Sequence, residues 1–254
     1  MTTKPQQQQL ETKASQATLE HKKVLLDLFA KRIMDDDQLL ANAGLYLRSS
    51  AVAKLLFLNE LYEMIVDVPG TIMEFGTWYG QNLSVFENLR AIHEPFNQNR
   101  RIIGFDTFSG YASVTDKDKS SEVTSGSAYA LPDDYPDYLR AVLAYHERNN
   151  VMGHIKKHSI VVGDVVKTIS KFFADNPGDI VSLAYFDMAT YAPTKACLEA
   201  VLPHAVPGSV FLMDELNFAE YDGASIAFKE VFANRKYKIK KSKFMTDRSI
   251  VILR

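Results

Sequence analysis

The sequence has little cysteine and no long apolar run. Its 254 residues include one cysteine, Cys197, which excludes an internal disulfide and a cysteine-rich zinc site. No apolar run approaches the length of about 18 residues that a membrane-spanning helix needs, and the residues that follow Met1 lack the apolar core of a signal peptide. We therefore expect a cytoplasmic protein that has no membrane partner.

Neither sign of charge is in large excess. The chain has 29 Lys and Arg residues against 31 Asp and Glu residues, a formal net charge of −2. Such a chain offers no broad basic face for a nucleic-acid backbone, so we expect no nucleic-acid partner. Apolar residues make up 46% of the sequence, enough for the core of one large domain. The expected partner is a small molecule or another protein.

The first 68 residues predict helices and no strands. Residues 1–14 contain a run of glutamines and predict a disordered terminus. Apolar residues recur at helical spacing over residues 15–34 and more strongly over residues 49–67. Between them, Asp35, Asp36 and Asp37 favour an acidic turn that opens a helix over a metal site. This helical preface, residues 15–68, is longer than an α/β core requires and is expected to cover the active site, the sheet edge or a neighbouring subunit.

From residue 71 onward, apolar segments alternate with amphipathic ones. Strands are predicted at residues 71–75, 101–106, 159–164, 180–187 and 209–215, and helices at residues 82–93, 136–149, 166–175, 193–202 and from 223 onward. Alternation of this kind predicts a mostly parallel sheet with right-handed crossovers. Two further strands, residues 237–240 and 249–253, form a terminal hairpin that supplies one antiparallel strand. We expect a single α/β domain over residues 15–254 with a seven-stranded sheet.

The turn after the first predicted strand contains two glycines. Gly76 and Gly80 allow backbone conformations that other residues avoid, and they let a ligand approach the chain beside the free N–H groups of the next helix. A second feature, the polar and turn-rich segment 107–135, is too long for a simple connection and predicts a lid or binding loop. Both features favour a ligand site at the carboxyl end of the sheet.

Acidic residues end the predicted strands. These residues are Glu74, Asp106, Asp164, Asp187, Asp214 and Glu215. Ligands of open α/β sheets bind outside the carboxyl ends of the strands, so we expect the acidic side chains to line one rim. Carboxylates crowded together raise one another's pKa values, which favours positively charged ligands among them. The pattern predicts two, an organic cation and a metal ion.

Several motifs together resemble one enzyme family. They are Glu74-Phe75-Gly76-Thr77-Trp78-Tyr79-Gly80, Asp106-Thr107-Phe108-Ser109-Gly110, Asp187 with Tyr191, Pro207-Gly208, Asp214-Glu215 and Tyr221-Asp222-Gly223. Over roughly residues 50–254 the chain resembles the S-adenosylmethionine-dependent sugar O-methyltransferases that tailor macrolide and aminocoumarin antibiotics. The resemblance implies a class I methyltransferase fold, which is Rossmann-like, with S-adenosylmethionine in the glycine-turn cleft and Mg²⁺ beside it.

The resemblance also implies a role for individual residues. The methionine end of the cofactor would be held by Glu74, Gly76, Thr77 and Gly80, with Trp78 in the cofactor wall or simply packed. The ribose hydroxyls would meet Asp106, and the adenine would meet Phe108, Gly163 and Asp164. The metal ligands would be Asp187, Asp214 and Glu215, and vicinal sugar hydroxyls would bind there. Tyr111 and Tyr129, in the expected lid, are candidates for substrate contact.

Two positions depart from the family pattern. Ala189 stands where the family commonly has an aspartate suited to act as general base, and Glu215 stands where the last metal ligand is usually an aspartate. The base could then be Asp187, Tyr191, a hydroxide held by the metal, or a histidine from elsewhere in the chain. We take Asp187 and Tyr191 as the catalytic candidates.

These observations leave four functions open. The first is O-methylation of a sugar hydroxyl on a glycosylated natural product or an activated deoxysugar. The second is methylation of a catechol-like hydroxyl. A nicotinamide-dependent dehydrogenase is disfavoured because the glycine turn lacks G-x-G-x-x-G spacing. The fourth is a catalytically degenerate module that binds the cofactor and serves assembly, which Ala189 would suit. The family resemblance and the long preface further predict a homo-oligomer.

Overall fold

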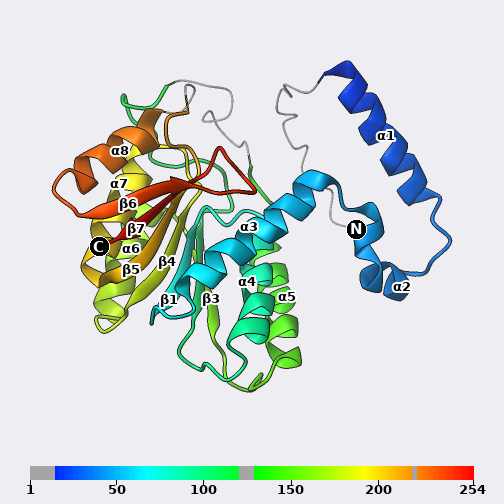
Figure 1. Cartoon of the computed structure of the whole chain (residues 1–254), viewed down its shortest axis with the longest axis horizontal. Coiled ribbons are helices and arrows are strands. Elements are labelled where there is room, and N and C mark those ends of the chain that lie inside the picture. Colours follow the sequence, from blue (N-terminus) through cyan, green and yellow to red (C-terminus); the bar gives the residue numbers. More distant parts are fainter. Residues whose placement is uncertain (1–14, 120–128, 219–221) are drawn as a thin grey trace.

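A seven-stranded sheet forms the centre of the protein (Figure 1). The computed structural model describes residues 15–119, 129–218 and 222–254. The strands are β1 (Thr71–Phe75), β2 (Ile102–Asp106), β3 (His158–Val162), β4 (Val181–Phe186), β5 (Ala205–Met213), β6 (Tyr237–Lys241) and β7 (Ser249–Leu253). Their order is β3-β2-β1-β4-β5-β7-β6, and β7 runs antiparallel to both of its neighbours while the other pairs are parallel. The predicted sheet and its single antiparallel strand are confirmed.

The helices fall close to their predicted positions. They are α1 (Gln16–Ala30), α2 (Asp36–Ala41), α3 (Ser49–Ile65), α4 (Gln81–His93), α5 (Tyr135–Asn149), α6 (Val165–Asp175), α7 (Tyr191–Val201) and α8 (Asp222–Phe232), with short 3-10 helices η1 (Ala43–Tyr46) and η2 (Leu202–His204). The acidic turn at Asp35 opens α2, because its carboxylate accepts a hydrogen bond from the N–H of Gln38 at 2.8 Å. The expectations for residues 1–14 and for the middle of the lid segment, 120–128, lie outside the described residues.

Two boundaries differ from prediction. Helix α1 ends at Ala30, four residues before the predicted end at residue 34. Strand β5 begins at Ala205, so Pro207 and Gly208 lie inside it and not in a turn before it. The pairing of β4 with β5 shifts register between Val181 and Leu183, and this irregularity accommodates the proline, which has no N–H to donate to a regular ladder.

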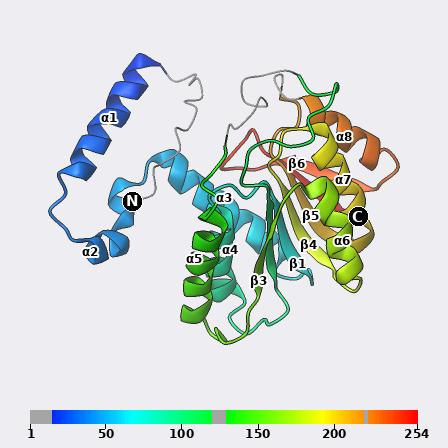
Figure 2. The same cartoon turned by 180° about the vertical axis from the view of Figure 1, so that it is seen from behind.

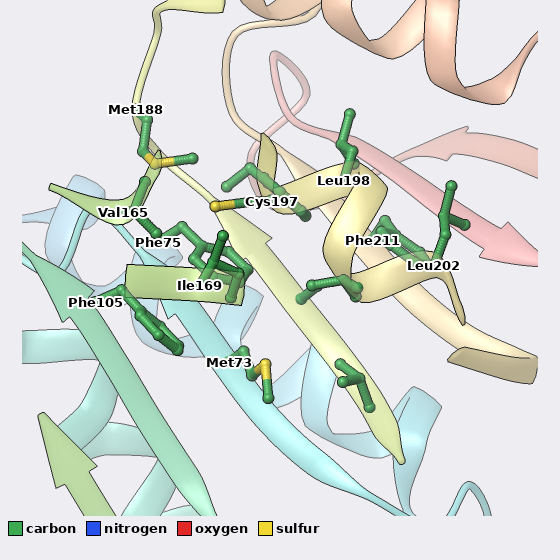
Figure 3. Close-up of a cluster of buried hydrophobic side chains, with 14 of the residues drawn as sticks. Met73, Phe75, Phe105, Val165, Ile169, Met188, Cys197, Leu198, Leu202 and Phe211 are labelled. Carbon is green, nitrogen blue, oxygen red and sulfur yellow. The ribbon is translucent and has the colours of Figure 1, made fainter. Parts of the chain in front are cut away.

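The sheet separates two apolar layers. Side chains of α6, α7 and α8 pack on one face, and those of α3, α4 and α5 pack on the other. Figure 3 shows part of the first layer, where Cys197 lies among Phe75, Ile169 and Leu198. Cys197 is fully buried and has no disulfide partner, so its predicted role in core packing is confirmed. Because helices cover both faces of the sheet, the polar groups gather at the carboxyl ends of the strands.

A buried arginine ties the amino end of the sheet to helix α3. The guanidinium of Arg100 donates to the carboxylate of Glu94, to the hydroxyl of Ser182 and to the backbone carbonyl groups of Ile65 and Gly70. Its side chain is 1% exposed. Hydrogen bonds satisfy the buried charge, which would otherwise be costly to bury. These hydrogen bonds hold the start of β1 in place. They therefore also help to fix the position of its carboxyl end at the site.

A second buried network joins α4, α5 and β3. The carboxylate of Glu147 lies 2.8 Å from Arg90 Nη2 and 2.7 Å from Lys157 Nζ, and His158 Nδ1 lies 2.7 Å from a carboxylate oxygen of Glu87. Two carboxylates and an imidazole at this spacing could hold a metal ion. Arg90 and Lys157, however, both pair with Glu147, and His158 pairs with Glu87, so each carboxylate already has a basic partner. We therefore interpret the cluster as an ion network that holds β3, an edge strand, against the helices.

Replacing His158 by glutamine should lower stability at mildly acidic pH and have less effect at alkaline pH. Burial lowers the pKa of His158, but its bonds to Glu147 and Glu87 outweigh burial and raise the pKa above 6.5. A raised folded-state pKa stabilises the protein below the unfolded-state value, and this stabilisation is lost as the pH rises through the folded-state pKa. Burial raises the pKa of Glu147, but its bonds to His158 and Lys157 lower it to about 2, so the contribution of Glu147 is lost only as the pH falls from 4.5 toward that value.

The measurement is the free energy of unfolding in urea of both proteins between about pH 5 and pH 9. The difference between the wild-type protein and His158→Gln should be largest at the acidic end of this range and should shrink as the pH rises. A difference that grows with pH would contradict the assigned network.

The N-terminal helices lie away from the sheet. Figures 1 and 2, seen from opposite sides, both place α1 and α2 beyond the end of α3. Neither helix has a buried residue, and large apolar side chains are exposed at Val24, Leu26, Leu28, Ile33 and Leu40. Helix α3 instead buries Phe57, Leu58 and Leu61 against the sheet. We call residues 15–48 the N-terminal arm.

Within the described part of the chain, no helix has the combination of length and apolar character that crossing a membrane requires.

Candidate active site

A cavity of about 360 Å³ opens at the carboxyl ends of the parallel strands. The structure brings five of the six predicted acidic residues into its lining: Asp106, Asp164, Asp187, Asp214 and Glu215. Gly76, Trp78 and Gly163 line it as well, together with Thr107, Gly110 and Tyr111 from the expected lid. The strand ends therefore meet as the parallel topology requires.

Glu74 does not line this cavity, contrary to expectation. Strand β1 continues to Phe75, so Glu74 lies within the strand, paired beside Gly104 and Tyr185 of its neighbours. The carboxylate is buried, with Oε1 accepting a hydrogen bond from Asn82 Nδ2 at 2.5 Å and Oε2 having no hydrogen-bond partner among the described residues. Burial raises the pKa of Glu74 to about 8 despite the bond from Asn82. Its unpaired oxygen is suited to a cationic partner.

The glycine turn leads the chain from β1 past the cavity into α4. Gly76 has a φ of +89°, and a Cβ atom at this position would overlap the backbone carbonyl oxygen of Asp187. Gly80 has a φ of +74° and is the residue before α4, where a Cβ atom would overlap Leu139. Thr77 and Gly80 do not line the cavity, and the Thr77 hydroxyl is buried without a hydrogen-bond partner in the described structure. Gly76 thus allows the tight approach of β1 to β4 that shapes the cavity floor.

Asp106 is held rigidly at the end of β2. One carboxylate oxygen accepts the N–H of Trp78 at 2.7 Å, and the other accepts the N–H of Phe108 at 2.6 Å. Burial raises the pKa of Asp106, while these backbone N–H groups act in the opposite direction. Each oxygen keeps a lone pair that could accept a hydrogen bond from a ligand hydroxyl.

The residues assigned to the adenine end have other contacts here. Asp164 caps the amino end of α6: one carboxylate oxygen accepts a hydrogen bond from the N–H of Val166 at 3.1 Å, and the other accepts one from the Ser113 hydroxyl at 2.9 Å. Phe108 does not line the cavity, and its ring packs instead near Tyr135, with ring centroids 6.2 Å apart. Asp164 therefore lines the cavity, whereas Phe108 lies outside its lining.

Asp187, Asp214 and Glu215 form the acidic centre of the site. Oxygen atoms from the three carboxylates all lie within 4.8 Å of one another. Burial raises the pKa of Asp187 and raises that of Glu215 far above its usual range, and burial followed by the charge of Asp187 raises the pKa of Asp214 to about 7. Closely spaced oxygen donors of this kind suit Mg²⁺. Three close carboxylates with raised pKa values would be stabilised by a divalent cation, so the residues present fit one. Glu215 can serve as a ligand although the family usually has an aspartate at this position.

Two basic residues beside the acidic centre were not predicted from the sequence. Arg248 lines the cavity and forms an ion pair with Asp214. Lys54 of α3 donates to the Tyr185 hydroxyl at 2.8 Å, and its charge lowers the pKa values of Glu74 and Asp187. The antiparallel direction of β7 explains Arg248, because the start of this strand lies where β5 ends and Met213 pairs with Ser249.

Tyr191, the second catalytic candidate, lies outside the lining of the cavity. Its hydroxyl donates to Glu230 at 2.6 Å and accepts from Lys195 at 3.0 Å, and Tyr191 does not line the cavity. The N–H of Tyr191 donates to Asp118 of the lid segment at 2.7 Å. At the first turn of α7 its side chain points toward α8 and away from the strand ends. Tyr191 therefore binds Asp118 of the lid segment through its N–H, and its hydroxyl binds Glu230 and Lys195.

The position of the missing base lies within the cavity. Ala189 lines it and has a φ of +58°, a conformation in which an aspartate is more common than an alanine. None of the described residues that line the cavity is a histidine. Of the candidate bases among the described residues, Asp187 lines the cavity.

An aromatic rim borders the cavity. The ring of Trp78 lies 5.4 Å from that of Tyr129, and Tyr129 lies 5.9 Å from Tyr111, between ring centroids and with edge-to-face orientation. All three residues line the cavity, and Tyr111 and Tyr129 come from the lid segment on either side of residues 120–128. The three predicted contact residues are thus brought together, and such rings suit the apolar face of a sugar or a cofactor base.

Comparisons with known proteins identify the family. No family model matches the sequence, and no curated protein matches it. The solved structure of CalS11, a calicheamicin methyltransferase, is 35% identical, with a TM-score of 0.87 and coverage of 95% of this chain and 94% of CalS11. A structure of CalS11 without ligands, described as a TDP-rhamnose 3'-O-methyltransferase of calicheamicin biosynthesis, is 33% identical, with a TM-score of 0.83 and coverage of 95% and 96%.

A more distant similarity concerns the fold alone. The O-methyltransferase NovP is 16% identical, with a TM-score of 0.60 and coverage of 80% of each chain. The class I methyltransferase fold and the resemblance to sugar O-methyltransferases of antibiotic biosynthesis are both confirmed. The chain belongs to the S-adenosylmethionine-dependent sugar O-methyltransferases of antibiotic biosynthesis.

Proposed function

We propose that this enzyme methylates a hydroxyl group of a deoxysugar, either activated or already attached to a natural product, with the help of Mg²⁺. The observation that carries the proposal is the acidic centre of Asp187, Asp214 and Glu215 inside the cavity that Gly76 and Asp106 also line. The similarity to a TDP-rhamnose 3'-O-methyltransferase over 95% of the chain supports the sugar class. The same similarity makes a catechol-like acceptor the weaker alternative.

The cofactor would lie along the glycine turn. S-adenosylmethionine supplies a methyl group on a positively charged sulfur. Glu74, with its unpaired buried oxygen, offers a carboxylate behind the turn for the amino group of the methionine end. Asp106, held by the N–H groups of Trp78 and Phe108, presents its remaining lone pairs to the ribose hydroxyls. Both carboxylates are fixed before the ligand arrives, which reduces the ordering cost of binding.

The metal would be held by Asp187, Asp214 and Glu215. A divalent cation supplies a Lewis acid that lowers the pKa of a bound hydroxyl. Asp187 lines the cavity and is half-buried there, so we assign it the proton of the acceptor hydroxyl in place of the family aspartate that is Ala189 here. The aromatic rim of Trp78 and the two lid tyrosines would border the bound sugar.

Calorimetry on the full chain tests the proposed ligands. S-adenosylmethionine should bind with micromolar affinity and NAD should not, and Mn²⁺, used as a probe for Mg²⁺, should bind to the wild-type protein. Binding of NAD without S-adenosylmethionine would contradict the proposal. Binding of the cofactor without any methyl transfer would instead favour the alternative function that Ala189 suits, a catalytically degenerate module that binds the cofactor and serves assembly.

We also propose that the N-terminal arm packs against a second copy of the chain. Its helices leave apolar side chains such as Leu28, Ile33 and Leu40 exposed, which a stable monomer would rarely do over one continuous segment. The mass in solution should therefore exceed that of one chain, 28.6 kDa. Deleting residues 1–48 should reduce the mass to that of one shortened chain, as measured by light scattering. An unchanged number of subunits after deletion would contradict this role of the arm.

A further inference from the structure

The described start of the lid segment, residues 107–119, runs from the end of β2 past the cavity to the start of α7. We call these residues the strap. Four of them line the cavity: Thr107, Gly110, Tyr111 and Ala112. The hydroxyl of Ser113 donates to Asp164 at 2.9 Å, and the carboxylate of Asp118 accepts a hydrogen bond from the N–H of Tyr191 at 2.7 Å. The strap is therefore attached to the amino ends of α6 and α7.

Asp118 caps α7 from outside the helix. The N–H that it binds belongs to Tyr191, the first residue of α7. The first N–H groups of a helix have no partner within the helix, and the helix dipole favours a carboxylate beside them. Thr190, the residue before α7, forms no capping hydrogen bond with its side chain. The strap thus supplies a cap that the sequence next to the helix does not.

Both oxygens of the Asp118 carboxylate are engaged. The second oxygen accepts hydrogen bonds from the N–H of Thr115 at 2.8 Å and from its hydroxyl at 2.9 Å. These bonds form within the strap and hold the first oxygen toward α7. Two exposed ion pairs also join the strap to α8: Lys117–Glu230 at 2.8 Å and Lys119–Asp222 at 2.7 Å. Exposed ion pairs contribute little, so we expect Asp118 to be the stronger attachment.

Gly223, in the first turn of α8, makes this contact possible. A Cβ atom at this position would overlap both the Asp118 oxygen that faces α7 and the backbone N atom of Tyr191. The oxygen could shift with its side chain, but the N atom belongs to the helix backbone. The glycine of the Tyr221-Asp222-Gly223 motif therefore has a structural reason, while Tyr221 lies outside the described residues.

The end of α7 that Asp118 caps also borders the cavity. Residues 187–190, which lead into α7, all line the cavity, as does Pro193 in the first turn of the helix. Asp187 itself is held by the sheet, because its N–H donates to the carbonyl oxygen of Phe75 at 2.9 Å. Release of Asp118 from α7 would therefore loosen the strap and leave the acidic centre in place.

We propose that Asp118 is a positioning residue that fastens the strap to α7 and so slows the release of the cofactor from the cavity. This inference rests on the proposed function, which places the cofactor along the glycine turn and beside Asp106. The strap begins at the next residue, Thr107, and lines the cavity from there. Cofactor bound at this position is retained while the strap stays attached, and Asp118 is the attachment at the end of the strap opposite β2.

The probe is S-adenosylhomocysteine, which the cofactor becomes when it loses its methyl group, and the measured quantity is its rate of dissociation from the full chain. The rate should rise about tenfold in Asp118→Ala, as expected for the loss of one charged hydrogen bond. Asp118→Asn keeps an acceptor oxygen, so its rate should fall between those of the wild type and Asp118→Ala. The matched control is Asp116→Ala, which should leave the rate unchanged, because Asp116 is exposed on the same strap and binds no described residue.

Two further measurements separate a positioning role from a purely structural one. Amide hydrogen exchange, measured without ligand, should become faster at Tyr191 and along the strap in Asp118→Ala, because the N–H of Tyr191 loses its acceptor. The affinity for Mn²⁺ should stay near the wild-type value, since Asp187 remains bound to β1. Gly223→Ala should also speed dissociation of S-adenosylhomocysteine, because its Cβ atom displaces the Asp118 carboxylate.

Three outcomes would overturn the proposal: an unchanged dissociation rate in Asp118→Ala, an equal increase in Asp116→Ala, or a parallel loss of Mn²⁺ affinity in Asp118→Ala. The last outcome would show that the substitution distorts the whole site. Failure of the proposed function is distinct, because S-adenosylhomocysteine would still leave Asp118→Ala faster while no sugar accepted a methyl group. Absence of S-adenosylhomocysteine binding to the wild type would contradict both.

Discussion

Replacing Asp214 by asparagine should reduce methyl transfer about a thousandfold, which corresponds to about 4 kcal/mol of transition-state stabilisation. Asparagine keeps the shape of the side chain and removes its negative charge. Asp214 belongs to the acidic centre, where its oxygen lies within 4.8 Å of those of Asp187 and Glu215. A centre with one carboxylate fewer should hold a divalent cation much more weakly. Asp214 has no part in the proposed cofactor contacts, so the affinity for S-adenosylmethionine should change little.

Two binding measurements accompany the rate. Mn²⁺ affinity should fall in Asp214→Asn while cofactor affinity stays near the wild-type value. Asp137→Asn makes the same chemical change on the exposed surface of α5, where Asp137 pairs with Arg140, and should alter neither. Equal losses of metal and cofactor affinity in Asp214→Asn would contradict the assignment of Asp214 to the metal.

Replacing Gly76 by alanine should largely abolish cofactor binding. The residue has a φ of +89°, which costs a residue with a side chain about 1–2 kcal/mol in backbone strain. In addition, the new Cβ atom would overlap the carbonyl oxygen of Asp187, a rigid backbone atom at the end of β4. Relief of that overlap has to move β1 away from β4, which displaces Asp187 and the cavity floor together. We expect the affinity for S-adenosylmethionine to fall by at least about a hundredfold, or about 2.7 kcal/mol.

Gly178 is the matched control for this substitution. A Cβ atom at Gly178 meets nothing within 4 Å, so Gly178→Ala should bind the cofactor as the wild type does. The free energy of unfolding, measured on both variants, separates lost binding from lost folding. Normal cofactor affinity in Gly76→Ala would mean that the turn is not the cofactor site.

The alternation of apolar and amphipathic segments was sufficient to predict the sheet. It also predicted the common rim, because parallel strands place their carboxyl ends together and Asp106, Asp187 and Asp214 directly follow or end their strands. The start of β5 was missed because Pro207-Gly208 is typical of a turn. Only the register shift against β4, a long-range feature, shows that the strand can continue through these residues.

Errors in the predicted site have local causes. Glu74 was taken as a strand end, but one more residue, Phe75, pairs with both neighbouring strands, and this moves the Glu74 carboxylate into the sheet. Tyr191 carries no sign in the sequence that Glu230 and Lys195 would bind its hydroxyl. Arg248 could have been found, because an antiparallel last strand must begin at the rim where the parallel strands end. Lys54 could not, since its approach to Tyr185 depends on how α3 crosses the sheet.

Methyl transfer from S-adenosylmethionine to a TDP-deoxysugar, followed by mass spectrometry with and without a chelator, tests the central claim most directly. The account predicts a product heavier by one methylene group, loss of its formation when the chelator removes divalent cations, and recovery when Mg²⁺ is restored. Methyl transfer that is equally fast with the chelator present, or cofactor binding with no transfer to any sugar, would contradict it.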